Sequence, residues 1–156
     1  MKLTENFTIE EAQVTKHNQF NNVISDINIL ENVKQIANSV MQPLRNYLGI
    51  PIIVSSWFRN PQLNAYIGGS KTSDHLTGEA VDFTCSRMID AYIHIKNDLL
   101  FHQLIWEIKG NVVWIHVSYR RLGKNRNEAK VAVWNNKKGK YDYQLFKNIS
   151  QLKGAK

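Results

Sequence analysis

Residues 73–82 read SDHLTGEAVD, and this stretch combines a turn with the start of a strand. Its first half is typical of a loop, and residues 80–83 read as extended chain. His75 and Asp82 are seven positions apart, so on a helix their side chains would lie two turns, about 10 Å, from each other. Gly78 lies between them, and a glycine-bearing turn can bring the two together. We therefore expect a turn at Gly78 that delivers His75 and Asp82 to one site.

The elements before this stretch include both helix and strand signals. Residues 28–48 carry apolar side chains at the three-and-four spacing of an amphipathic helix, which Gly49 ends. Residues 51–56 form a short β-branched run that predicts a core strand. Residues 7–20 contain a helix start, because Thr8 and the glutamates that follow fit a capping box.

The elements after the quoted stretch continue in mixed order. We expect helices over residues 59–67 and 87–99, strands over 102–106, 112–119 and 130–134, and a last strand or helix over 141–152. No repeat or linker interrupts the chain. The pattern predicts one α+β domain over residues 1–156, with an antiparallel sheet and flanking helices. The basic segment 120–156 is either part of this domain or appended to it.

The composition is that of an ordinary globular protein. The 156 residues are 43% hydrophobic and 21% charged, and one hydrophobic core is normal at this length. The lone Cys85 excludes an internal disulfide and has no metal-binding pattern around it, so we interpret it as a buried apolar residue rather than a reactive thiol. No run approaches the ~18 apolar residues of a membrane span.

The net charge is +7, and the excess of lysine and arginine lies from Arg120 onward. A basic balance attracts polyanions, so charge alone leaves nucleic acid and anionic cell-wall polymers open as partners. No nucleic-acid motif, such as a Cys/His finger, accompanies the charge. We therefore expect no nucleic-acid partner.

Two histidines and one carboxylate are a common ligand set of a catalytic zinc site, which keeps a fourth position open for water. His75 and Asp82 lie in the quoted stretch, and His116 lies in a later predicted strand. The chain can therefore supply a Zn²⁺ site, although other divalent ions accept the same ligands. For His94 and His102 we expect surface or core roles, with a role as ligand or second-layer donor left open.

The pattern SxHxxGxAxD from Ser73, followed by WIH at residues 114–116, resembles the zinc D-Ala-D-Ala carboxypeptidases of the M15 peptidase family. The resemblance is strongest to the compact forms common in phages. It extends over about residues 7–119 and includes SSWFR at residues 55–59. It implies a zinc fold of the Hedgehog and DD-peptidase kind, and it assigns as metal ligands His75, Asp82 and His116.

The resemblance also implies roles for residues around the metal. Arg59 matches the family's arginine that binds the substrate carbonyl oxygen, where a fixed guanidinium stabilises the oxyanion. Ser73 matches a serine that contacts substrate or caps the turn. Trp57 and Trp114 are predicted to contact substrate, with core packing as the alternative.

The general base is where this chain departs from the family pattern. Several members carry an acidic residue three positions before the last histidine, and here that position is Val113, which cannot move a proton. Compact members place a glutamate at the end of the preceding strand, and Glu107 fits that pattern. Glu107 is therefore the predicted base.

The turn after Glu107 decides whether it reaches the metal. If residues 108–113 form a six-residue loop, Glu107 faces Trp114 and lies about 7 Å from His116 on the diagonal. A tight hairpin turning at residues 109–110 would instead put it about 13 Å away along the strand. In the second case the expected substitutes are Asp74 and Glu79.

Together these features predict a zinc metallopeptidase that hydrolyses peptide bonds in peptidoglycan stem peptides, as a D-Ala-D-Ala carboxypeptidase or an endopeptidase of the phage lysis type. The alternative, which Val113 favours, is a catalytically weak or inactive zinc-containing module that binds cell wall or forms part of a virion. We expect a monomer with peptidoglycan, and anionic wall polymers, as partners. The start of the chain lacks the apolar stretch of a signal peptide, so we expect synthesis in the cytoplasm and action at the cell wall or periplasm.

Overall fold

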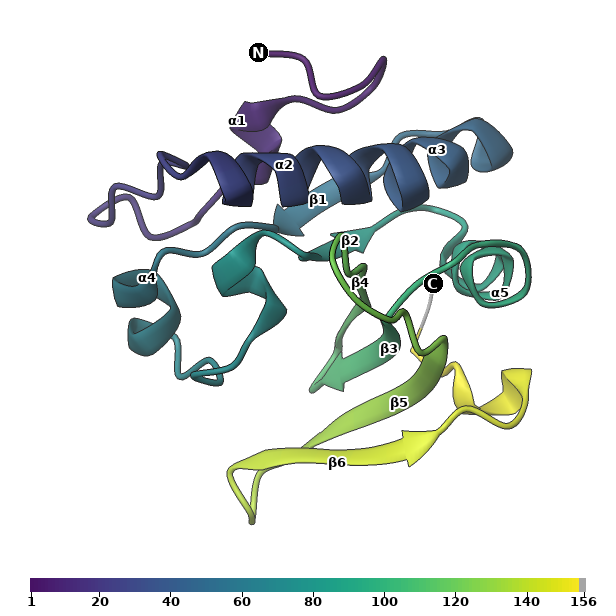
Figure 1. Cartoon of the computed structure of the whole chain (residues 1–156). Coiled ribbons are helices and arrows are strands. Elements are labelled where there is room, and N and C mark those ends of the chain that lie inside the picture. The colour runs from purple at the N-terminus through teal and green to yellow at the C-terminus, as the bar shows by residue number, and fades with distance from the viewer. Residues whose placement is uncertain (155–156) are drawn as a thin grey trace.

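The computed structural model describes residues 1–154 and places six strands in one sheet (Figure 1). The strands are β1 (Ile53–Ser56), β2 (Ala80–Thr84), β3 (Gln103–Lys109), β4 (Val112–Ser118), β5 (Glu128–Asn135) and β6 (Lys140–Leu145). Their order across the sheet is β1-β2-β4-β3-β5-β6. Every neighbouring pair is antiparallel except β3 and β5, which are parallel. The predicted α+β class is confirmed, with one parallel pair in a mostly antiparallel sheet.

The helical segments include those predicted over residues 28–48, 59–67 and 87–99. They are α1 (Ile9–Ala12), α2 (Ile27–Ile36), the π-helical η1 (Ala37–Met41), α3 (Gln42–Leu48), α4 (Pro61–Tyr66), the 3-10 turn η2 (Asp74–Thr77), α5 (Met88–Asp98) and the 3-10 turn η3 (Ile149–Gln151). The helix predicted over residues 28–48 is one continuous run of α2, η1 and α3. Asp26 caps its start and Gly49, at φ +65°, ends it.

The first helix is much shorter than the stretch that carries its start signal. The capping box is present, because Thr8 N–H donates to Glu11 Oε2 and Glu11 N–H donates to Thr8 Oγ1. The helix ends at Ala12, whose carbonyl accepts from Phe58 N–H at 2.9 Å. The next carbonyl, that of Gln13, accepts from the Asn22 side chain. Because these two carbonyls accept tertiary hydrogen bonds, they do not accept the backbone hydrogen bonds that would continue the helix.

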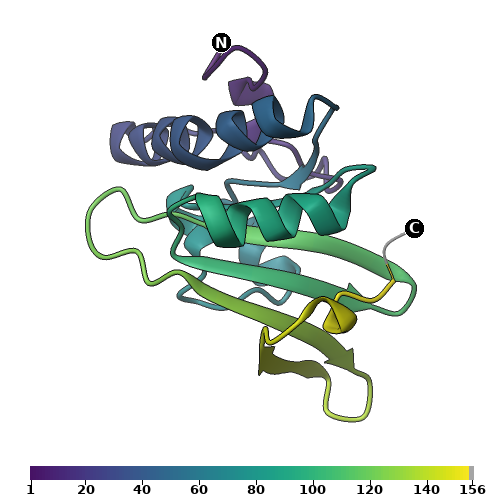
Figure 2. The same ribbon diagram turned by 90° about the vertical axis from the view of Figure 1, so that its right-hand side faces the viewer.

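The two faces of the sheet have different roles, because side chains alternate along each strand. One face carries Leu104 and Trp106 of β3 with Ile115 and Val117 of β4, all fully buried. Helices α2, α3 and α5 pack into this cluster, and Figure 2 shows α5 lying across the sheet. Each such side chain contributes roughly 1.5–3 kcal/mol when it leaves water. The opposite face is thereby left to carry polar groups.

The β3–β4 hairpin corrects one expectation. Residues 108–113 do not form a six-residue loop, because Ile108 pairs with Val113 and Lys109 pairs with Val112. The turn is tight, but it is centred one residue later than the tight turn considered above, with Gly110 at φ +59°. The pairing of Glu107 with Trp114 is therefore present in a two-residue hairpin.

The segment after residue 119 continues the sheet. β5 pairs with β3 over six positions, and Val131 and Leu152 belong to the same hydrophobic cluster as the rest of the core. In Figure 1 β6 lies at the end of the molecule opposite α1. Ala155 and Lys156, the end of the predicted basic segment, lie outside the described residues. Among residues 1–154 no helix is long and apolar enough to cross a membrane.

Candidate metal centre

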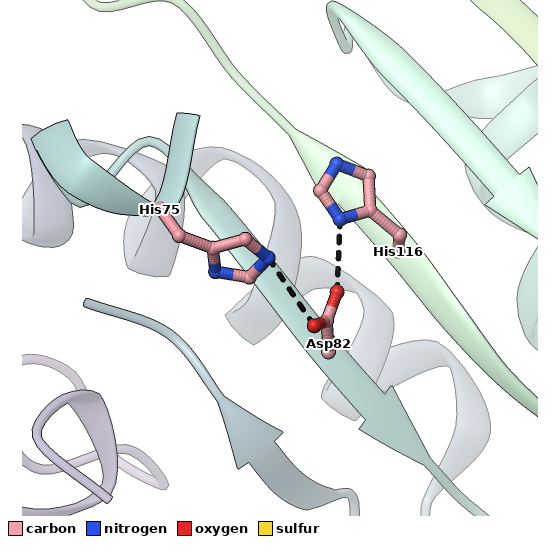
Figure 3. A group of neighbouring side chains, drawn as sticks. All are labelled: His75, Asp82 and His116. Atoms are coloured by element: carbon pink, nitrogen blue, oxygen red, sulfur yellow. Dashed lines mark hydrogen bonds and ion pairs between the residues drawn. The ribbon is translucent and has the colours of Figure 1, made fainter. Parts of the chain in front are cut away.

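Three predicted ligand residues converge on the polar face of the sheet (Figure 3). His75 comes from η2, Asp82 from β2 and His116 from β4, and one ligand atom of each lies within 4.8 Å of the others. His75 Nε2 is 3.2 Å from Asp82 Oδ2, and His116 Nδ1 is 2.8 Å from Asp82 Oδ1. Asp82 and His116 are register partners in the β2–β4 pair, so the sheet itself fixes two of the three.

The turn that carries His75 is built from its neighbours in sequence. Ser73 caps η2 by accepting from His75 N–H at 3.3 Å, and Gly78 ends it at φ +73°. His75 Nδ1 lies 2.6 Å from the Trp57 carbonyl. A carbonyl only accepts, so Nδ1 carries the proton and Nε2 keeps its lone pair toward Asp82. The predicted glycine turn thus presents His75 as a metal ligand.

Trp57 holds this turn and does not face the cleft. Its side chain is fully buried, and its Nε1–H donates to the Gly78 carbonyl at 3.2 Å. The predicted substrate contact of Trp57 is therefore wrong, because the indole has no surface that a substrate can reach. Its part in the site is structural: its carbonyl fixes His75 and its indole fixes the end of the turn.

The donor set fits zinc. Ligand atoms about 2.0–2.2 Å from a common tetrahedral ion lie roughly 3.3 Å apart, close to the 3.2 Å and 2.8 Å between Asp82 and the two histidines. Two imidazoles and a carboxylate are borderline donors of the type zinc accepts, and three protein ligands leave a position for water. The residues present would therefore hold a catalytic zinc ion.

The electrostatics also favour metal binding. Burial lowers the pKa of His75, against the opposing pull of Asp82, so the imidazole is neutral and able to bind a metal. Burial alone would raise the pKa of Asp82, but the neighbouring histidines hold it well below its usual range. Burial also opposes the charged form of His116, whose pKa is nonetheless raised by the hydrogen bond that it donates to Asp82 and by the Asp82 charge. Asp82 is thus a carboxylate placed between two imidazoles.

Arg59 reaches the site from the end of β1, as predicted. Its Nη2 is 2.7 Å from Asp82 Oδ2, and its Nε donates to Ser56 Oγ at 2.8 Å. Its backbone N–H donates to the His75 carbonyl at 3.0 Å, which ties the two loops together. Within residues 1–154 its Nη1 makes no hydrogen bond. The guanidinium is therefore fixed and keeps a donor for a substrate oxygen.

Glu107 lies on the same sheet face as His116. It pairs with Trp114, which places it diagonal to His116, about 7–8 Å between backbones. Burial, with a contribution from the Asp82 carboxylate, raises the pKa of Glu107 to about 7. A carboxyl with that pKa can accept and return a proton near neutral pH.

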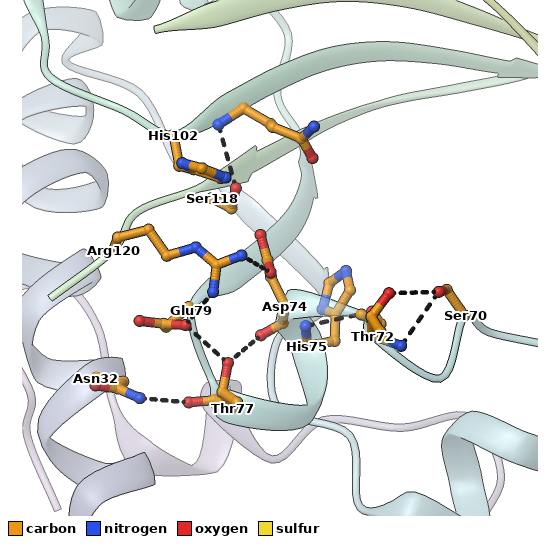
Figure 4. A network of polar contacts seen from close by, with 12 residues as sticks. Asn32, Ser70, Thr72, Asp74, His75, Thr77, Glu79, His102, Ser118 and Arg120 are labelled. Atoms are coloured by element: carbon orange, nitrogen blue, oxygen red, sulfur yellow. Dashed lines mark hydrogen bonds and ion pairs between the residues drawn. The ribbon is translucent and has the colours of Figure 1, made fainter. Parts of the chain in front are cut away.

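Three other positions were considered for the base from the sequence. Val113 packs against the core, on the face opposite His116. Arg120 binds both remaining candidates, with Nη2 2.6 Å from Asp74 Oδ1 and Nη1 2.9 Å from Glu79 Oε2 (Figure 4). The sequence did not indicate this role of Arg120. The network braces the turn that carries His75, and Glu107 remains the candidate base on the ligand face.

The remaining histidines take no part in the metal group. His94 stacks on Tyr47 with ring centroids 3.8 Å apart and contacts Asp98. His102 is buried, and its Nδ1 lies 3.2 Å from the Lys124 carbonyl. Among residues 1–154 only one group of histidine and acidic side chains has metal-binding spacing, and it is the one described above.

The metal group opens into a cleft of about 1050 Å³. Ser73, Arg59, Glu107 and Trp114 line it, so the predicted substrate contacts of Ser73 and Trp114 remain open to a ligand. The wall formed by β5 and β6 was not predicted, and it contributes Trp134, Tyr141 and Tyr143. The alternation of these aromatics would have indicated a shared face, but only if residues 141–152 had been assigned to a strand.

Residues 5–118 match the family model described as Peptidase M15. The matched segment covers most of the chain and contains the three ligand residues with Arg59 and Glu107. A comparison with curated proteins gives no significant match. M15 peptidases are in general zinc-dependent, which agrees with the donor set found here. The chain therefore belongs to the M15 family of zinc metallopeptidases.

Proposed function

We propose that this peptidase hydrolyses peptide bonds in the stem peptides of bacterial peptidoglycan, as a carboxypeptidase or an endopeptidase. One observation carries the catalytic part of the proposal. Glu107, with its pKa raised to about 7 by burial, shares a sheet face with the ligands Asp82 and His116. A base, a metal ligand set and a fixed arginine are the groups that hydrolysis of a peptide bond requires.

The hydrolysis uses one water, one substrate carbonyl and groups of the chain. His75, Asp82 and His116 would hold a zinc ion, which would supply a Lewis acid for the water and the carbonyl when bound. Glu107 takes a proton from the water as its oxygen bonds to the carbonyl carbon. Arg59 donates a hydrogen bond to the oxygen that becomes negative. Glu107 then returns the proton to the amine nitrogen as the C–N bond breaks, which leaves a carboxylic acid and an amine. The carboxylic acid loses its proton to solvent and becomes a carboxylate.

The cleft supports a peptide that carries carboxylates. Its volume of about 1050 Å³ is at the upper end of small-molecule pockets, which suits a branched or extended substrate. Its lining contains more basic than acidic side chains. The basic members are Arg59, Lys109, Arg120, Arg126 and Lys140. Stem peptides bear free carboxylates, so this balance favours them over a basic peptide.

The alternative is a catalytically weak or inactive zinc module that binds the wall or forms part of a virion. Val113 is the residue that favours it, because the family's acidic residue is missing there. The placement of Glu107 supports the active enzyme, since a carboxyl on the ligand face can replace that acid. The resemblance to compact phage enzymes extends the proposal to action at the cell wall during phage lysis. In this proposal the enzyme acts as a monomer, and its net charge of +7 attracts it to anionic wall polymers.

The test is release of soluble peptide or D-Ala from purified peptidoglycan. Wild-type protein, chelated protein and Glu107→Gln are compared, with zinc content measured in parallel. Loss of release in the last two, with zinc retained in Glu107→Gln, is expected. Glu128→Gln is the matched control, because Glu128 lies in β5 beside Lys130 and outside the cleft lining. Zinc binding by the wild type without release of any wall product would favour the inactive module.

A further inference from the structure

One wall of the cleft is aromatic, and the proposed hydrolysis does not use it. Trp114 comes from β4, Trp134 from β5, and Tyr141 and Tyr143 from β6. All four line the same cleft as the metal group. The family match ends at residue 118, so three of the four belong to a part of the chain outside it. We call these four residues the aromatic wall.

The register of the sheet shows how the aromatic wall leads away from the catalytic groups. One row of cross-strand partners runs from Trp114 through Glu107 and Ala132 to Tyr143. Neighbouring strands lie about 4.8 Å apart, so Tyr143 lies about 14 Å from β4 across the sheet. A ligand whose scissile bond lies beside Glu107 therefore meets the aromatic wall if it continues toward β6.

The rings of the aromatic wall hold one another in place. Tyr141 meets Trp114 at 6.4 Å and Trp134 at 5.1 Å between centroids, both edge to face. Tyr143 is tilted against Tyr141 at 6.2 Å, and its side chain is 56% exposed. The other three rings are half-buried, and none of the four belongs to the hydrophobic core, so the cluster is available as a binding surface along the cleft. Because the rings already pack against one another, the side chains lose little conformational entropy when a ligand binds.

Polar groups accompany the rings. Lys109 Nζ lies 4.2 Å from the Trp134 ring centroid, and Lys130 Nζ lies 5.9 Å from that of Tyr143. Each ammonium group lies over one ring, so the wall offers aromatic surface together with ammonium and phenol donors. The matching ligand has a flat C–H face edged by hydroxyl and amide oxygens, which describes an N-acetylated pyranose sugar. Its C–H groups meet the negative ring faces, and its oxygens accept from the lysines.

We propose that the aromatic wall binds the N-acetylated sugar chain to which the stem peptide is attached. This inference rests on the proposed function, because it assumes that the peptide in the cleft carries that sugar. Continuity with the catalytic cleft supports this occupant, since one substrate supplies both the bond beside Glu107 and the rings beside Tyr143. The wall then selects intact wall fragments over free peptide.

The first test needs no catalysis. A tetramer of N-acetylglucosamine, which has no peptide, is titrated into the full chain while tryptophan fluorescence is recorded. We expect saturable binding that Tyr143→Ala weakens about tenfold, the effect of losing one stacking ring. Tyr47→Ala is the matched control, because Tyr47 is 52% exposed but lies on α3, where it stacks on His94 of α5. Absence of saturation, or equal binding by wild type and Tyr143→Ala, overturns the inference.

The second test compares two substrates: stem peptide with its sugar and the same peptide without it. We expect Tyr143→Ala to lower kcat/KM for the sugar-bearing peptide about tenfold more than for the free peptide. An equal loss on both would mean that the wall contacts peptide, and would sink the inference. If the wild type cleaves neither substrate, the proposed function fails, while the sugar titration still decides whether the wall binds sugar. Tyr143→Leu repeats both tests with the apolar bulk of the strand retained.

Discussion

Glu107 and Trp114 are paired across the β3–β4 hairpin. Ile105 and His116 form the neighbouring pair on the same face, and Asp82 pairs with His116 from the other side. The candidate base and two metal ligands are thus held by one backbone hydrogen-bond network rather than by separate loops. A site built on strands keeps its geometry better than one built on loops.

Replacing Glu107 by glutamine tests this arrangement. The amide has nearly the same shape but cannot take a proton from water. We expect kcat to fall about 10²–10⁴-fold, the usual contribution of a positioned base, with zinc content unchanged. Steady-state kinetics on a wall peptide, with metal analysis of the same samples, measures both. Retention of more than a tenth of the wild-type kcat would rule out Glu107 as the base.

The pH profile reports the same group. Glu107 must be ionised to act as a base, so activity is expected to fall as pH drops through its pKa. Burial raises that pKa to about 7, and a bound zinc ion would lower it again. The acid limb of kcat/KM is therefore expected between the ordinary glutamate pKa of about 4.3 and 7. Kinetics from pH 4 to 8 locates it, and Glu128→Gln, distant from the metal, is expected to leave the limb in place.

The turn between His75 and Asp82 and most elements were predictable because their signals are local, whereas His116 was assigned as a ligand from the family resemblance. The spacing of His75, Gly78 and Asp82 specifies a turn before a strand, and periodicity specifies the long helix that ends at Gly49. The position of the hairpin turn was not predictable. Gly110 permits a turn centred on either neighbour, and a shift of one residue changes every pair in the register.

The parts that the sequence left open depend on contacts distant along the chain. Arg120 takes its role from Asp74 and Glu79, more than 40 positions earlier, and no local pattern marks such a pairing. Trp57 was predicted to contact substrate. Its burial depends on core residues distant along the chain, so the local sequence does not reveal it. The pairing of β5 with β3 is parallel and also long-range, so the aromatic wall could not be placed before the strand order was known.

Asp82 is the central ligand, so its replacement tests the metal site. Asp82→Asn removes the charge between the two histidines, and we expect zinc content to fall to background. Chelation of the wild type is expected to lower its Tm, since an ion bound at 100 times its Kd stabilises the folded state by about 2.7 kcal/mol. Thermal melts with and without chelator measure this shift. Asp82→Asn should show no shift, whereas His94→Gln, remote from the site, should match the wild type.

Gly78 supports the turn that presents His75, and its replacement by alanine tests how tightly that turn is packed. At φ +73° an alanine is strained by roughly 1–2 kcal/mol. Its Cβ would also lie 2.7 Å from a methyl of Val33 and 3.1 Å from one of Ile29, and such crowding adds roughly 1–3 kcal/mol. We expect Gly78→Ala to reduce the free energy of unfolding by about 2–5 kcal/mol.

Gly49 provides the matched control for Gly78. It has φ +65°, but a Cβ there meets no atom within 4 Å, so Gly49→Ala is expected to lose only the conformational part, about 1–2 kcal/mol. Urea unfolding of the chelated proteins measures both variants without a contribution from metal. Because η2 carries His75 and ends at Gly78, Gly78→Ala should also weaken zinc binding, whereas Gly49→Ala should not. Equal destabilisation by the two variants would show that the α2 side chains yield to the added methyl, and that the turn is not held by packing against Val33.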